Sequence, residues 1–105
     1  MNSSYTIHIK DAVTNLVRSF APEKIILFGS AAQGKFGPDS DLDFLIIKKG
    51  LSSNPLERMR QARRAAAVNA PCDFLVLTPE ELAQRIQWEY PFYTSIIKTG
   101  KILYD

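Results

Sequence analysis

Several residue types are scarce in this chain of 105 residues, and each scarcity excludes a class of protein. The only cysteine, Cys72, cannot form an internal disulfide, and the only histidine, His8, has no cysteine or second histidine near it to share a metal ion. No apolar run approaches the roughly 20 residues that cross a bilayer, and the first residues lack a basic and then apolar leader. These absences predict a cytoplasmic protein without a membrane segment.

The charge of the chain is also nearly balanced, with 13 basic and 11 acidic residues. A dedicated polynucleotide-binding protein is expected to concentrate basic residues, so this balance argues against direct nucleic-acid binding. The length predicts a single domain over residues 1–105, with no room for a second domain that recognises a substrate. We therefore expect another molecule to supply the surface for any acceptor.

The apolar pattern alternates between helix and strand. Residues 9–20 have helical spacing, and further helices are expected to begin at Asn54-Pro55 and Thr78-Pro79, each with a glutamate three residues after the cap that reaches back to it. Strands are expected near residues 24–28, 41–48 and 73–77, and the tail predicts a short helix and an edge strand, 101–104. This order predicts an α/β (α+β) fold, a small mixed β-sheet with helices packed on one face.

Four residues at the first two strands point to chemistry. Gly29-Ser30 ends the first strand, and after ten intervening residues Asp41 and Asp43 stand with one residue between them at the head of the second strand. Side chains two residues apart on a strand share a face, so the two carboxylates can form a magnesium site. Backbone N–H groups after Gly29 can face an anion. Metal and phosphate together indicate a nucleotide.

This stretch resembles the G-S-x10-D-x-D signature of the DNA polymerase β-like nucleotidyltransferase superfamily, and the short chain is similar to its minimal nucleotidyltransferase branch. The resemblance implies that two magnesium ions are held by Asp41, Asp43 and a third acid on a neighbouring strand. Asp73 is the candidate, because it begins the third apolar strand as the pair begins the second. Its alternatives, Glu80 and Glu81, are better explained as helix-capping residues.

The resemblance also implies phosphate-binding residues in the loop. Ser30 is expected to bond a phosphate oxygen of ATP, and Gly29 to permit close backbone approach. Lys35 either neutralises phosphate charge or is a solvated loop lysine. The family commonly has arginines after the serine, whereas Ala31 and Gln33 stand here.

By the same resemblance, the protein is expected to transfer AMP from ATP to a hydroxyl, in particular a tyrosine, of a HEPN-family partner. It would then be the antitoxin of a HEPN toxin. The alternative is an antitoxin or assembly module with a weak catalytic site that acts by binding its partner, which the loss of the loop arginines favours.

Three other features have a structural and a functional interpretation. For Cys72 a small buried apolar residue is favoured over a nucleophile, because no histidine follows to activate it. A run of arginines in the second long helix is expected to form a solvated face rather than a partner contact. An aromatic cluster near the end is expected in the core, and any exposed part of it would be a protein interface. The arginines are Arg58, Arg60, Arg63 and Arg64, and the aromatic residues are Trp88, Tyr90, Phe92 and Tyr93.

Overall fold

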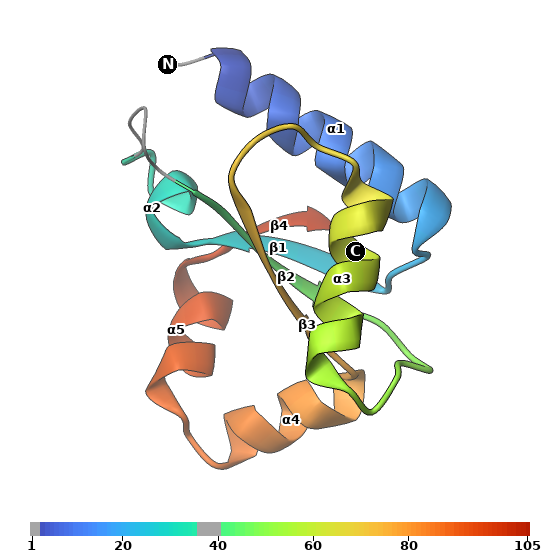
Figure 1. Ribbon diagram of the computed structural model, residues 1–105. Helices are drawn as coiled ribbons and strands as arrows, with labels where there is room; N and C mark the ends of the chain where they lie inside the picture. The colour runs from blue at the N-terminus through green and yellow to red at the C-terminus, as the bar shows by residue number, and fades with distance from the viewer. Residues whose placement is uncertain (1–2, 36–40) are drawn as a thin grey trace.

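A computed structural model describes residues 3–35 and 41–105 of the chain. Within these ranges no helix is both long enough and apolar enough to cross a membrane. The described elements follow the predicted alternation of helix and strand closely (Figure 1). They are α1 (Ser3–Ser19), β1 (Lys24–Phe28), α2 (Gly29–Ala32), β2 (Leu42–Ile47), α3 (Pro55–Ala66), β3 (Cys72–Leu77), α4 (Pro79–Gln87), α5 (Pro91–Thr99) and β4 (Lys101–Tyr104).

The four strands form one sheet in the order β3-β2-β1-β4. Strand β1 is antiparallel to both β2 and β4, whereas β2 and β3 are parallel and are joined by a crossover through α3. Parallel neighbours need such a crossover because a tight hairpin reverses the chain direction. The sheet is therefore mixed, as predicted, and β4 lies at its edge.

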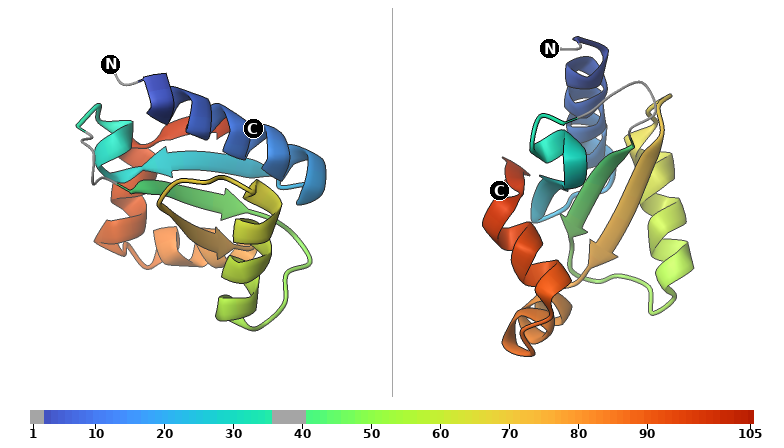
Figure 2. Two further views of the ribbon diagram at one scale, coloured as in Figure 1. Left: turned by 45° about the horizontal axis from the view of Figure 1, so that its top comes forward. Right: turned by 90° about the vertical axis from the view of Figure 1, so that its left-hand side faces the viewer.

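The helices cover both faces of the sheet, so the prediction that they pack on one face is wrong. In the edge-on view on the right of Figure 2, α3 lies on one side of the strands and α5 on the other. The core under α1 and α3 contains Leu27 and Phe44, and the core under α4 and α5 contains Ile26 and Leu45. Successive residues of both strands are thus buried on opposite faces. Such continuously apolar strands are typical of a sheet that is covered on both sides.

The predicted caps of α3 and α4 differ in outcome. Thr78 and Glu81 form the full capping box at the start of α4, as predicted. At α3, Asn54 caps the helix by accepting from the first N–H groups, but Glu57 does not reach back. The Asn54 N–H donates instead to Ser52 Oγ, 3.1 Å away, so the local turn has already satisfied that donor.

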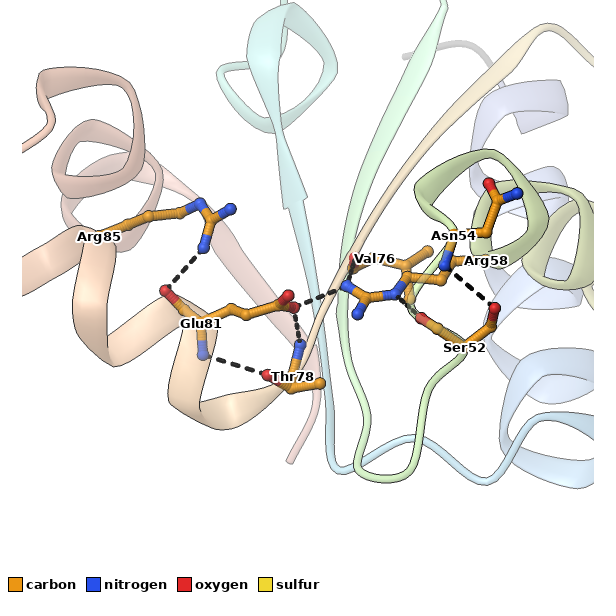
Figure 3. Close-up of polar contacts among 7 residues, drawn as sticks. All are labelled: Ser52, Asn54, Arg58, Val76, Thr78, Glu81 and Arg85. Carbon is orange, nitrogen blue, oxygen red and sulfur yellow. Dashed lines mark hydrogen bonds and ion pairs between the residues drawn. The ribbon is translucent and has the colours of Figure 1, made fainter.

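Arg58 links α3 to β3 and α4, and the prediction that it belongs to a solvated face is wrong. Its side chain is buried, and its guanidinium donates to Glu81 Oε1 at 2.6 Å and to the carbonyl oxygens of Ser52 and Val76 (Figure 3). The bond from Arg58 lowers the pKa of Glu81, and so does the Thr78 N–H, which donates to the same carboxylate oxygen. The network lies at the end of β3, away from Asp73 at its beginning, and it holds α4 against the sheet.

Candidate active site

The strand register brings the three predicted acids together where β2 and β3 begin, and we call this end of the sheet the acidic edge. Asp43 is directly opposite Asp73 in the parallel pair β2–β3 and opposite Phe28 in the antiparallel pair β1–β2. Directly opposed residues project their side chains from the same face, so Asp43, Asp73 and Phe28 share the face that α5 covers. Asp41 lies two residues before Asp43, just ahead of β2, and is close enough for its charge to act on Asp43.

The three carboxylates influence one another electrostatically. The pKa of Asp43 is raised, first by burial and then by the negative charges of Asp73 and Asp41 and a hydrogen bond with Asp73. Asp43 is half-buried, whereas Asp41 and Asp73 are exposed. Adjacent Cys72 is buried, as predicted, and burial raises the pKa of its thiol. A divalent cation at this edge would relieve the repulsion among the acids.

Gly29 is in direct contact with the acidic cluster. Its φ of +76° lies in the left-handed region, which residues with a Cβ atom rarely adopt. A Cβ atom at this position would also collide with Oδ2 of Asp43. Glycine is therefore required twice over, for the turn from β1 into α2 and for the close approach of that turn to the carboxylate.

The model of the family described as polymerase beta, nucleotidyltransferase, matches residues 10–105. This chain belongs to the polymerase beta nucleotidyltransferase family. A solved structure from Sulfolobus solfataricus, described as "a putative nucleotidyltransferase", is 30% identical, with a TM-score of 0.59, and the match covers 73% of this chain and 69% of that chain. No curated protein gives a significant match.

The family match confirms the predicted polymerase beta-like fold, and the structure shows where the other predicted residues lie in it. The exposed Ser30 is the second residue of α2, directly after Gly29, and Lys35 is tied to the same turn because its N–H donates to the Ser30 carbonyl oxygen at 2.9 Å. Ala31 is buried in the core, whereas Gln33 is exposed. The turn that holds Ser30 and Lys35 is therefore the same turn that meets the Asp43 carboxylate at Gly29. Their roles toward phosphate stay predictions.

The donor set of this nucleotidyltransferase fits magnesium. Over residues 3–35 and 41–105, no three or more His, Cys, Asp or Glu side chains are grouped so that they alone could hold a metal ion. Magnesium in nucleotide sites is commonly held by one or two carboxylates together with water and substrate phosphates. Asp41 and Asp43 offer hard oxygen ligands of that kind, and Asp73 offers a third on the next strand.

A pocket that the sequence did not predict lies beside this edge. It has a volume of about 400 Å³ and lies between α2 and α5, with Phe28, Gly29 and Gln33 on one wall and Phe92 on the other. The sequence contains one indication of this pocket, because the aromatic residue Phe28 directly precedes the Gly29 turn. No local pattern indicated that α5 would lie opposite it.

Proposed function

We propose that this protein is a magnesium-dependent nucleotidyltransferase that transfers AMP from ATP to a hydroxyl, in particular a tyrosine, of a HEPN-family partner, and that it thereby acts as an antitoxin. The observation that carries the transfer is the register that sets Asp43 opposite Asp73, with Gly29 against the Asp43 carboxylate. Acids from two strands and the turn expected to bind phosphate meet at one edge. The partner and the antitoxin role rest on the resemblance to minimal nucleotidyltransferases.

The proposed reaction is a displacement at the α-phosphorus of ATP. The acceptor oxygen forms a bond to this phosphorus while the bond to the oxygen that bridges to the β-phosphorus breaks, and pyrophosphate leaves with that electron pair. Magnesium, when bound with ATP, stabilises the negative charge on the attacking and leaving oxygens. Asp41 and Asp43 would hold it. Asp73, exposed on the neighbouring strand, would take the proton of the incoming hydroxyl.

The way in which the helices cover the sheet supports the proposal that the acceptor belongs to another protein. Both faces of the sheet are covered by the chain's own helices, and the described residues contain no further module beside the site. Trp88 and Tyr90 are each about half exposed, at 54% and 46%, and contact each other edge to face. An exposed aromatic pair of this kind is suited to a protein partner.

The second candidate function is a module that silences its partner by binding alone. It is favoured by the lack of positive charge at two positions after Ser30, where Ala31 is buried in the core and Gln33 is uncharged. These positions commonly carry arginine in the family. A turn with less positive charge would stabilise the developing negative charge less well.

Substitution of Asp73 with asparagine distinguishes the two functions. Wild type and Asp73→Asn would be incubated with magnesium, ATP labelled at the α-phosphate, and a HEPN protein encoded beside this chain. We expect label on the partner with wild type, and full ATP binding but no label with the variant. Glu80→Gln, which alters an exposed acid in the first turn of α4, is the matched control and should label normally.

Two results would contradict this proposal in different ways. If wild type silences the partner without labelling it, the binding module is the correct function. If Asp73→Asn labels as fast as wild type, transfer is correct but Asp73 has been assigned the wrong role.

A further inference from the structure

We propose that the pocket between α2 and α5 binds the nucleobase of the nucleoside triphosphate. This inference rests on the proposed function, because it assumes that the phosphates lie at the turn from β1 into α2. Figures 1 and 2 both show α2 and α5 at the same end of the sheet. The pocket between them has a volume of about 400 Å³, within the usual range of small-molecule sites.

The pocket is continuous with the acidic edge. Gly29 is at once a wall of the pocket, the first residue of α2 and the neighbour of the Asp43 carboxylate. Phe28, also in the wall, is directly opposite Asp43 in the sheet. A nucleotide whose phosphates lie at Gly29 and whose α-phosphorus lies near Asp43 can therefore extend its other end into the pocket. That end is the nucleobase, the flat part of the molecule.

The wall formed by α5 offers a ring for stacking. Phe92 contacts Phe28 at 5.9 Å between ring centroids, with the planes at 88°, and Tyr93 at 5.1 Å and 86°. These edge contacts fix the orientation of the Phe92 ring, yet the residue remains 54% exposed. An oriented and exposed aromatic ring is the feature on which nucleobases stack in sequence-tolerant nucleic-acid sites.

Polar groups around the ring match the edge of a base. Ser95 and Thr99 line the pocket one turn apart on α5, and the Thr99 hydroxyl donates to the Ser95 carbonyl oxygen, which leaves its own oxygen able to accept. Gln33 lines the opposite wall with an amide that can both donate and accept. A neutral amide where the family commonly has arginine is better suited to a neutral base than to a phosphate.

The test compares two ligands that share their phosphates. Magnesium with ATP and magnesium with inorganic tripolyphosphate would be titrated calorimetrically into wild type and into Phe92→Ala. Loss of one base-to-ring stack should weaken ATP binding roughly 5- to 150-fold and leave tripolyphosphate binding unchanged. Trp88→Ala is the matched control, because Trp88 is also 54% exposed but does not line the pocket, and it should change neither affinity.

A second variant tests the opposite wall of the pocket, and several results would contradict the proposal. Gln33→Ala changes an exposed residue on the other wall and should also weaken ATP but not tripolyphosphate. Equal weakening of both ligands, or of neither, by Phe92→Ala would overturn the nucleobase site. Unchanged ATP binding with reduced labelling of the partner would show that the pocket receives the acceptor instead. If wild type binds no ATP, the proposed function fails together with the pocket, whereas ATP binding that is insensitive to Phe92 overturns the pocket alone.

Discussion

Replacing Gly29 with alanine should damage both the fold and the site, and the two effects can be separated. Gly29 combines a left-handed backbone with a close contact to Asp43. Gly50 has nearly the same φ, +70° against +76°, but a Cβ atom added there meets nothing within 4 Å. Gly50→Ala therefore reproduces the backbone strain of Gly29→Ala without the collision.

The backbone part of the effect is expected in both variants. Holding alanine in the left-handed region costs roughly 1–2 kcal/mol of folding free energy. For a domain of this size each 1 kcal/mol lowers the melting temperature by roughly 4–8 °C. Thermal denaturation followed by circular dichroism should show a loss of about that size for each variant, with a greater loss for Gly29→Ala if the collision also strains the turn.

The functional part of the effect is expected only at Gly29. The new Cβ atom would take the place of Asp43 Oδ2, so the carboxylate must rotate away from its position opposite Asp73. Displacing a group that orients a metal ligand commonly costs about 10- to 100-fold in affinity. Calorimetric titration of magnesium with ATP should show a loss of that order for Gly29→Ala and none for Gly50→Ala. Equal ATP affinities in the two variants would refute the inference that Gly29 positions the Asp43 carboxylate.

Two further substitutions test the electrostatics. The pKa of Asp43 in the folded protein lies above its ordinary value of 3.8, so the folded protein loses stability as the pH rises from 3.8 through the folded-state pKa and Asp43 ionises. Asp43→Asn should therefore melt at a higher temperature than wild type at pH 7, while it loses magnesium-dependent ATP binding. A lower melting temperature for the variant would contradict this. Arg58→Met should lower the free energy of unfolding by about 1.5–3 kcal/mol in urea at pH 7, because it breaks the charged bond to Glu81, whereas Arg64→Met on the exposed side of α3 should have little effect. The pKa of Glu81 is depressed below its ordinary 4.5, so the stability from this pair is present above pH 4.5 and lost as the pH falls further, and the difference between wild type and Arg58→Met should shrink there.

The sequence alone determined the features that depend on neighbouring residues. The capping box from Thr78 to Glu81, the bounds of β1 and the stop of α5 before Gly100 all follow from local chemistry, and the structure has each of them. The spacing of Gly29-Ser30 and the aspartate pair belongs to this class too. It identified the family, since a turn and two carboxylates at a set distance along the chain need no knowledge of distant segments.

Only the tertiary structure decided which distant segments meet. The apolar runs of β1 and β2 did not show that α5 would cover the second face of the sheet, because a buried strand looks the same in sequence whichever helix covers it. Arg58 seemed to be one of four solvated arginines until the crossover placed it against Glu81, 23 positions away. The nucleobase pocket was hidden for the same reason, because Phe28 and Phe92 come together only when α5 packs against the end of β1.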